Sequence, residues 1–281
     1  MSYICSDCPR DCKIDRDLQF GGCGVKSEIV VAKIIKNFMW EEPSLCFNRG
    51  VTAIFFSGCN LKCEFCQNEK ISRGSIGDVY TVDEFVRLLM LLDEEETDGF
   101  DFISPTQFTG KLLEAFDKYK PKHKIIWNSN GYEKEEHIEK LAKFVDVFLP
   151  DFKYHDNSLG QRISRVTDYN DVCLKAICKM SELKPVVFEG DEMKQGVIVR
   201  HLILPDETKD SMDVIDDIKD NCPNVYVSLM SQFVPTGKGE KKRRLTPLEY
   251  KIVISHFKKV GLSRGYFQEM DSSSEQFIPK F

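Results

Sequence analysis

The sequence predicts an α/β fold with a parallel sheet of about six strand–helix units, preceded by a small cysteine-rich extension. Two observations lead to this prediction. From residue 51 onward, short runs rich in β-branched and aromatic residues alternate with amphipathic helical stretches. Residues 1–50 lack this alternation and hold five cysteines. We therefore divide the chain into an extension, residues 1–50, and a sheet domain, residues 51–281, which is either doubly wound or curled into a full or partial barrel.

The predicted strands are short, and the helices between them are amphipathic. Strands are expected at 51–56, 100–104, 124–130, 145–154, 196–204 and 225–230. The helices that follow them are expected at 81–96, 106–120, 133–144, 170–183, 211–222 and 246–260. Thr81 with Glu84, and Thr246 with Glu249, have the spacing of a capping box, which supports two of these helix starts. In such folds the carboxyl ends of the strands carry the chemistry.

Composition limits the class of protein. The chain has 281 residues, of which 42% are hydrophobic, enough for one large core or two modest ones. No apolar signal segment opens it, and no stretch approaches 18 uninterrupted apolar residues, so we expect a cytoplasmic protein that does not enter the membrane. In that compartment, eleven cysteines indicate metal binding or catalysis rather than disulfides. A net charge of −6 argues against general nucleic-acid binding.

Three cysteines follow directly on the first strand of the sheet domain. Cys59, Cys63 and Cys66 have the spacing C-x3-C-x2-C, with Phe65 just before the last one. Three thiolates can hold three irons of a 4Fe-4S cluster, whereas the usual cluster takes four. The fourth iron is then open to the amino and carboxylate groups of S-adenosylmethionine (SAM), whose sulfonium the cluster can reduce. A zinc site and buried free cysteines are the alternatives, although so polar a loop makes a poor core.

The motifs resemble the radical SAM superfamily, and within it the proteins related to pyruvate formate-lyase activating enzyme. The resemblance rests on "CSDCPRDC", "FFSGCNLKCEFCQN", "SPTQF", "RHLILP" and "SLMSQFVP", which are spread along nearly the whole chain. It implies a partial TIM-like barrel, a 4Fe-4S cluster, SAM, and an electron donor of the flavodoxin or ferredoxin type. It also implies that a 5′-deoxyadenosyl radical takes hydrogen from a glycine of a partner protein. Another peptide or a small molecule is the alternative substrate, and a non-catalytic Fe-S carrier is the alternative class.

The resemblance places the first cofactor contacts in two loops. Phe65 and Asn68 belong to the cysteine loop. Ser104, Pro105 and Thr106 belong to "SPTQF", which occupies the place of a G-G-E segment that binds the methionyl amino group in relatives. The change leaves backbone contacts in place and removes the acidic side chain.

Two further strand ends complete the cofactor contacts that the resemblance implies. Asn128 and Ser129 lie where relatives have an Asp-Thr-Asn-Gly segment that helps to hold a monovalent cation, and here asparagine replaces the aspartate. Asp151 and Lys153 match a D-x-K motif, which would orient the carboxylate and amino groups of SAM.

The last two strands are expected to reach both SAM and the substrate. Arg200 would pair with a carboxylate of SAM or of a peptide, and a structural salt bridge is the alternative. Since His201 alternates with it along the strand, only one of the two should face the interior, and we favour Arg200. Met230 and Gln232 would line the mouth, and core packing is the alternative for Met230. Six units rather than eight leave a lateral gap that can admit a loop of another protein, so we predict a polypeptide substrate.

The extension carries its own candidate metal site. Cys5, Cys8, Cys12 and Cys23 have the spacing C-x2-C-x3-C-x10-C. Four thiolates suit a second Fe-S cluster, and a tetrahedral zinc site is chemically as acceptable. Cys46 could substitute for one of these ligands.

Overall fold

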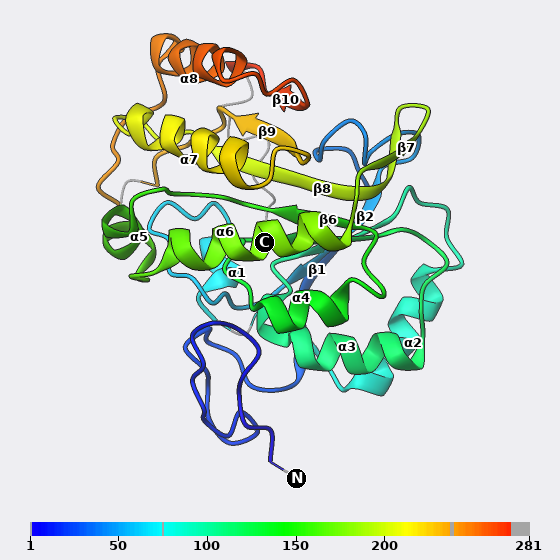
Figure 1. Ribbon diagram of the computed structural model, residues 1–281. Helices are drawn as coiled ribbons and strands as arrows, with labels where there is room; N and C mark the ends of the chain where they lie inside the picture. Colours follow the sequence, from blue (N-terminus) through cyan, green and yellow to red (C-terminus); the bar gives the residue numbers. More distant parts are fainter. Residues whose placement is uncertain (1, 75, 237–238, 271–281) are drawn as a thin grey trace.

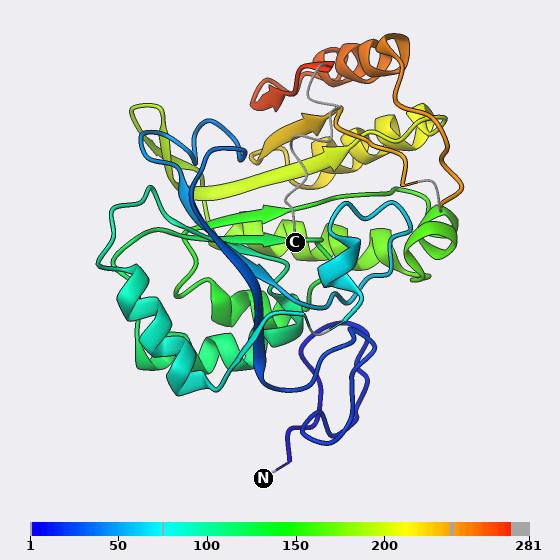
Figure 2. The same cartoon turned by 180° about the vertical axis from the view of Figure 1, so that it is seen from behind.

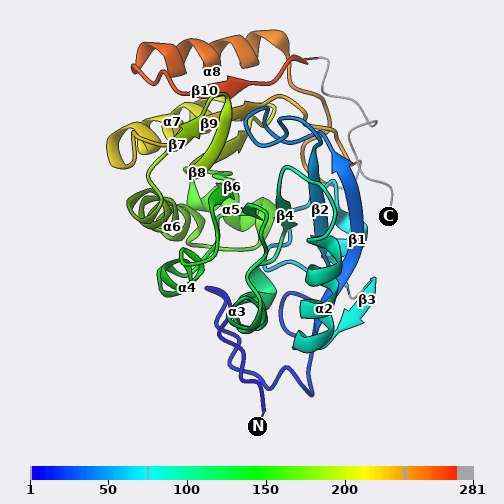
Figure 3. The same ribbon diagram turned by 90° about the vertical axis from the view of Figure 1, so that its right-hand side faces the viewer.

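The computed structural model describes residues 2–74, 76–236 and 239–270. Its centre is a curved sheet whose parallel strands neighbour one another in the order β2, β4, β5, β6, β8, β9, β10 (Figure 1). Seen from the side in Figure 3, the strands form an arc with the helices outside it. The partial TIM-like barrel is confirmed. These strands are β2 (Val51–Phe56), β4 (Phe100–Ile103), β5 (Ile125–Ser129), β6 (Val147–Pro150), β8 (Glu192–Leu202), β9 (Tyr226–Met230) and β10 (Gly265–Phe267).

Helices cover the convex face of the sheet (Figures 1 and 3). They are α2 (Val82–Leu92), α3 (Thr109–Lys118), α4 (Glu135–Leu141), α6 (Tyr169–Leu183), α7 (Thr208–Asn221) and α8 (Pro247–Lys259), with the shorter α1 (Glu69–Ser72), α5 (Asn157–Ser164) and a 3-10 turn (Thr106–Phe108). Both predicted capping boxes are present, at Thr81 before α2 and at Thr246 before α8. Nowhere in the described ranges is a helix long and apolar enough to cross a membrane.

Alternation along each strand divides the core into two parts. Ile126 faces the barrel interior, in a cluster with Phe55 and Leu149. Trp127, the next residue, is fully buried in the larger cluster between sheet and helices. Asn128, one step further along β5, therefore returns to the interior, where it lines a cavity. The period of two thus fixes which polar side chains can meet inside the barrel.

Antiparallel strands extend the sheet beyond the predicted units. β1 (Ile29–Phe38) pairs with β2, β3 (Asp78–Tyr80) pairs with β1, and β7 (Val187–Glu189) pairs with β8 (Figure 2). β1 was not predicted, because residues 1–50 do not show the alternation of strand and helix patterns that begins at residue 51. Its apolar run Ile29–Val31 is buried. Pairing with β2 provides hydrogen-bond partners for the backbone of this strand, which an unpaired loop would lack.

The connection between β1 and β2, residues 39–50, crosses toward the other side of the barrel. The Met193 N–H at the start of β8 donates to the Ser44 carbonyl at 3.0 Å. The backbone N–H groups of residues 48, 49 and 50 donate to one carboxylate oxygen of Asp98 at 2.8–2.9 Å. These bonds hold the connection across the open side of the barrel, so part of the predicted lateral gap is covered by the chain itself.

Candidate functional site

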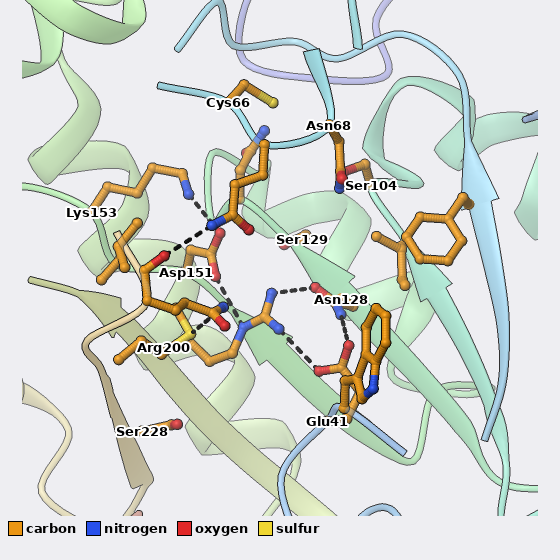
Figure 4. A pocket seen from close by; sticks show the side chains of 18 of the residues that line it. Glu41, Cys66, Asn68, Ser104, Asn128, Ser129, Asp151, Lys153, Arg200 and Ser228 are labelled. Carbon is orange, nitrogen blue, oxygen red and sulfur yellow. Dashed lines mark hydrogen bonds and ion pairs between the residues drawn. The ribbon is translucent and has the colours of Figure 1, made fainter. Parts of the chain in front are cut away.

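A cavity of about 710 Å³ opens at the carboxyl ends of the parallel strands and reaches the connection between β1 and β2. Its size lies within the range of about 300–1,000 Å³ that is typical of small-molecule sites. Figure 4 shows polar side chains from several strand ends pointing into it. The lining includes the predicted residues Cys59, Cys63, Phe65, Cys66, Asn68, Ser104, Asn128, Ser129, Asp151, Lys153, Arg200, Met230 and Gln232.

The three loop thiols share the wall of this cavity. Cys59 Sγ accepts from the Asn130 side-chain amide at 3.3 Å, and Cys63 Sγ lies 2.8 Å from the Ser164 hydroxyl. Burial raises the pKa of Cys59 to about 12, and the charges of Cys63 and Cys66 add to the effect. The three thiolates therefore repel one another, and bound iron would offset this because it takes the deprotonated form.

In the described part of the chain, no three or more His, Cys, Asp or Glu side chains are close enough together to hold a single metal ion. The ligands of a 4Fe-4S cluster each bind a different iron, so they need not converge on one point. The set of donors fits such a cluster, with three thiols on one loop.

The cysteine loop owes its shape to contacts with the extension. Gly58 has φ +78°, and a Cβ there would lie 2.8 Å from the Cys23 carbonyl oxygen, so only glycine fits. The next residue, Cys59, donates its N–H to the same carbonyl at 3.1 Å. Asn60 joins the loop to the residue after β5, because its Oδ1 accepts a hydrogen bond from the Asn130 side-chain amide at 2.6 Å. The loop is thus clamped between the extension and the end of β5.

Gln107 is a positioning residue that the sequence analysis missed. It is 1% exposed, and its side-chain amide donates to the carbonyls of Ser57 at 2.9 Å, Gly58 at 3.1 Å and Ser104 at 2.7 Å. Ser104 has φ +56°, which turns the chain sharply after β4. Gln107 therefore joins the "SPTQF" loop to the cysteine loop. Its place in "SPTQF" was noticed, but nothing in the pattern singled it out.

Pro105 and Thr106, predicted as cofactor contacts, do not belong to the described cavity lining. Thr106 is 1% exposed and turns to the far side of the loop, where its hydroxyl donates to Glu133 Oε1 at 2.8 Å. Trp127 Nε1 donates to the same oxygen at 3.0 Å. Burial raises the pKa of Glu133, and these hydrogen bonds oppose the rise. The buried carboxyl group of Glu133 thus supports the "SPTQF" loop on the side away from the cavity.

Arg200 is the centre of a charged network inside the cavity (Figure 4). Its guanidinium donates to Asp151 Oδ1 at 3.0 Å, to Glu41 Oε2 at 3.0 Å and to Asn128 Oδ1 at 2.5 Å. Lys153 Nζ lies 2.6 Å from the other oxygen of Asp151. Burial raises the pKa of Asp151, but Lys153 and Arg200 outweigh it and leave the pKa below its usual value. The structural salt bridge considered for Arg200 is therefore present.

The neighbour of Arg200 faces the other way, as the strand alternation predicted. His201 is 1% exposed and does not line the cavity, and its Nδ1 lies 2.7 Å from the Phe152 carbonyl oxygen. Glu41, by contrast, lines the cavity and was missed. It lies in a connection without a motif, 159 positions from Arg200, so no local signal points to it.

The extension packs on the site through a buried ion pair. Arg16 is 1% exposed and donates from Nη1 to Asp7 Oδ2 at 2.7 Å and to the Gln107 carbonyl at 2.6 Å. Asp7 Oδ1 also accepts from the Gly110 N–H, at the start of α3, at 3.1 Å. Since Gln107 holds the cysteine loop, this ion pair connects the extension to the wall of the cavity.

The four extension cysteines lie outside the cavity lining, and among the described residues they are not arranged around one metal ion. Burial raises the pKa of Cys8 to about 12, and the charges of Cys23, Cys5 and Cys12 add to it. Cys46 lies elsewhere: its thiol is 3.3 Å from the Phe38 carbonyl oxygen and packs in the barrel interior. Its suggested role as a substitute ligand is therefore wrong.

Comparison with known sequences places the chain among radical enzymes and their relatives. The sequence model of the Radical SAM superfamily matches residues 53–218. The uncharacterized protein MJ0674 of Methanocaldococcus jannaschii is 29% identical over 275 residues, which cover 93% of this chain and 76% of the relative. A glutamate–tRNA ligase of Leptospira biflexa is 34% identical over 116 residues, which cover 38% of this chain and 22% of the ligase.

Solved structures share the fold at low sequence identity. SuiB of Streptococcus suis has a TM-score of 0.54 at 16% identity over 76% of this chain, which spans 47% of SuiB. A radical SAM methyltransferase of Sphaerobacter thermophilus has a TM-score of 0.51 at 12% identity over 79% of this chain and 68% of its own. The structure of anSMEcpe with bound AdoMet has a TM-score of 0.50 at 16% identity, over 75% of this chain and 61% of its own. These likenesses concern the fold.

Proposed function

Because the chain belongs to the radical SAM superfamily, we propose that it cleaves SAM reductively and uses the radical to take a hydrogen atom from a glycine of a partner protein. Membership implies a 4Fe-4S cluster and SAM as cofactors. The observation that carries the proposal is one cavity that joins the three loop thiols to the network of Asp151, Lys153 and Arg200. A ligand with amino, carboxylate and sulfonium groups needs such charges of both signs beside a metal site.

Polar groups left without partners fit a bound cofactor. Asn68 Oδ1 is buried in the cavity wall and has no hydrogen-bond partner among the described residues. Buried polar atoms of this kind cost free energy unless a ligand or water completes them. Bound here, the two cofactors would supply reductive cleavage of SAM between sulfur and C5′, with the electron provided by an external donor.

The side chains of the protein would bind the cluster, orient SAM and exclude water from the cavity. Cys59, Cys63 and Cys66 would hold the cluster, while Asp151 and Lys153 would orient the methionine part of SAM. Phe65, which packs 6.0 Å from Phe233 between ring centroids, lines the cavity wall and keeps it apolar near the thiols. A water-poor site keeps the radical from side reactions until substrate hydrogen is within reach.

The partners that we propose follow from this chemistry. A flavodoxin- or ferredoxin-type protein in the cytoplasm would supply the electron, and the partly covered open side of the barrel would receive a polypeptide. Radical modification of another peptide or of a small molecule is the second candidate. A non-catalytic Fe-S carrier needs no ligand cavity beside its thiols, so the cavity disfavours it.

We also propose that Cys5, Cys8, Cys12 and Cys23 bind an auxiliary Fe-S cluster or zinc, which makes residues 1–50 a metal-binding extension to the barrel of residues 51–281. The mutual electrostatic effect of these thiols supports the proposal. The Cys59 N–H donates to the Cys23 carbonyl, so the extension is joined to the cysteine loop through the backbone.

Two measurements test the proposed function. The protein is reconstituted anaerobically with iron and sulfide, and 5′-deoxyadenosine is measured after addition of SAM and dithionite. Cys63→Ala should give none, while Cys178→Ala, which changes a cysteine outside the cavity, should match wild type. Incubation with lysate from the source organism should then give a doublet glycyl signal in electron paramagnetic resonance. Product formation driven by a small-molecule fraction, with a silent protein fraction, would refute the glycine assignment and leave SAM cleavage intact.

A further inference from the structure

Glu42 is a carboxylic acid buried in the cavity wall without a full set of partners. The residue is 7% exposed and lines the cavity. Its Oε2 has no hydrogen-bond partner in the described ranges. The backbone at this point is fixed, because the Glu42 carbonyl accepts the N–H groups of Leu45 at 2.8 Å and Cys46 at 3.2 Å. A buried carboxylate held in this way costs free energy unless a ligand completes it.

The cationic side chains that line the cavity form ion pairs with carboxylates other than Glu42. Among the described lining residues the cationic side chains are Lys153 and Arg200. Lys153 pairs with Asp151 at 2.6 Å, and Arg200 pairs with Asp151 and Glu41 at 3.0 Å each. Burial raises the pKa of Glu42 to about 7; Arg200 opposes the rise, and Glu41 adds to it. Glu42 therefore faces the cavity as an acid that forms no ion pair of its own with the described cationic lining residues.

A second buried carboxyl group lies in the same network, and burial together with Glu41 raises its pKa well above the usual value. Asp101 is 0% exposed, and its Oδ1 also lacks a partner among the described residues. Its Oδ2 accepts from the Asn128 amide at 3.3 Å, which joins it to the network around Arg200. The pKa of Arg200 is raised by four nearby carboxyl groups, those of Asp151, Glu41, Glu42 and Asp101. One guanidinium therefore interacts with several acids.

We propose that the Glu42 end of the cavity binds a positively charged nitrogen group of the substrate, an alkylammonium or a guanidinium. This inference rests on the proposed function, since it names the chemistry of the substrate that the cavity takes beside SAM. Figure 4 shows Glu41, Arg200 and Ser228 at one end of the cavity and Cys66 and Asn68 at the other. The cationic group thus binds at the end away from the thiols. In a polypeptide substrate it is a Lys or Arg side chain close to the target residue.

Aromatic side chains around this end suit a cation. Trp40 and Tyr266 line the same cavity, and a cation over an aromatic face is attracted by the ring. Trp40 is 46% exposed, so its ring remains accessible from the cavity mouth. The protein has two tryptophans, and the other, Trp127, is 0% exposed. The fluorescence of Trp40 therefore reports on a ligand near Glu42.

The test measures binding without any chemistry. Reconstituted protein with SAM and no reductant is titrated with n-butylammonium, n-butylguanidinium and the neutral butyramide. A second pair of probes is acetyl-Gly-Lys-Gly-amide and the same peptide with norleucine for lysine. Tryptophan fluorescence and calorimetry follow binding. Cationic probes should bind about 10- to 100-fold more tightly than their neutral counterparts, as expected for a hydrogen bond between charged groups.

Three variants assign the effect. Glu42→Gln should remove the preference for cations, and Glu42→Asp should keep it. Glu94→Gln, which changes a surface carboxylate with a side-chain exposure of 73%, should bind like wild type. Circular dichroism checks that each variant is folded. If Glu42→Gln does not fold, the ratio between charged and neutral probes in wild type and Glu42→Asp decides the question.

Specific results would overturn the inference. Equal affinity for charged and neutral probes would do so, as would a preference that survives in folded Glu42→Gln. Displacement of n-butylammonium by an equal concentration of K⁺ would assign the site to an inorganic cation instead. Tighter binding of the lysine peptide than of n-butylammonium identifies a peptide side chain, and the reverse identifies a small amine; both support the inference. Because no reductant is present, a failure of SAM cleavage would leave this result unaffected.

Discussion

Replacing Arg16 with methionine should destabilise the protein strongly although Arg16 lies outside the cavity lining. The side chains of Arg16 and Asp7 are 1% and 4% exposed, with 2.7 Å between Nη1 and Oδ2. Methionine keeps much of the volume but leaves the Asp7 carboxylate buried without its cation. Loss of one partner of a buried ion pair costs about 3–5 kcal/mol.

The structure favours the lower end of that range. Asp7 would still accept from the Tyr3 hydroxyl at 2.6 Å and from the Gly110 N–H at 3.1 Å. We therefore expect a loss of about 3 kcal/mol in the free energy of unfolding. A chain of 281 residues has an unfolding entropy of about 0.6 kcal/mol/K near 60 °C, so the midpoint should fall by about 5 °C.

Thermal unfolding of reconstituted protein, followed by circular dichroism, measures the shift. Arg87→Met, on the exposed side of α2, is the matched control and should change the midpoint little. In the double variant Arg16→Met with Asp7→Asn, the loss should be smaller than the sum of the two single losses, because the stranded charge is gone. A shift below about 1 °C for Arg16→Met, or additive losses in the double variant, would refute the reasoning.

Three further predictions concern the thiols and one histidine. Alanine at Cys59, Cys63 or Cys66 should abolish 5′-deoxyadenosine formation, because each cluster ligand is needed; wild-type yield in any of them would contradict the assignment. The triple alanine variant should retain iron or zinc in the extension by elemental analysis, and a metal-free protein would mean that the four extension cysteines form no site. Burial lowers the pKa of His201 from 6.5 to about 4, so the unfolded chain takes up its proton first as the pH falls. The stability that this group contributes above pH 6.5 should therefore be lost progressively toward pH 4, by up to about 3 kcal/mol. His201→Gln should remove that part of the pH dependence, and an unchanged profile in denaturant titrations would argue against it.

Much of the fold was predictable because its signals are local. The change between a period of two and a period of 3.6 places the six predicted strand–helix units, and the capping boxes at Thr81 and Thr246 mark two helix starts. β10 and β1 were missed for opposite reasons. β10 has only three residues, too few for a pattern, whereas β1 is an apolar, strand-like run that lies within the residues assigned to the extension.

The sequence by itself determined that the three loop thiols share one wall of the cavity, because all three lie within eight positions directly after β2. It also determined that Asp151 and Lys153 act together, since residues two apart leave a strand on the same side. Only the tertiary structure decided what Arg200 meets. Its partner Glu41, 159 positions away, and the neighbouring Glu42 come from a connection without periodicity. The ion pair of Glu41 with Arg200 and the burial of Glu42 without a full set of partners arise only when distant segments pack around one cavity.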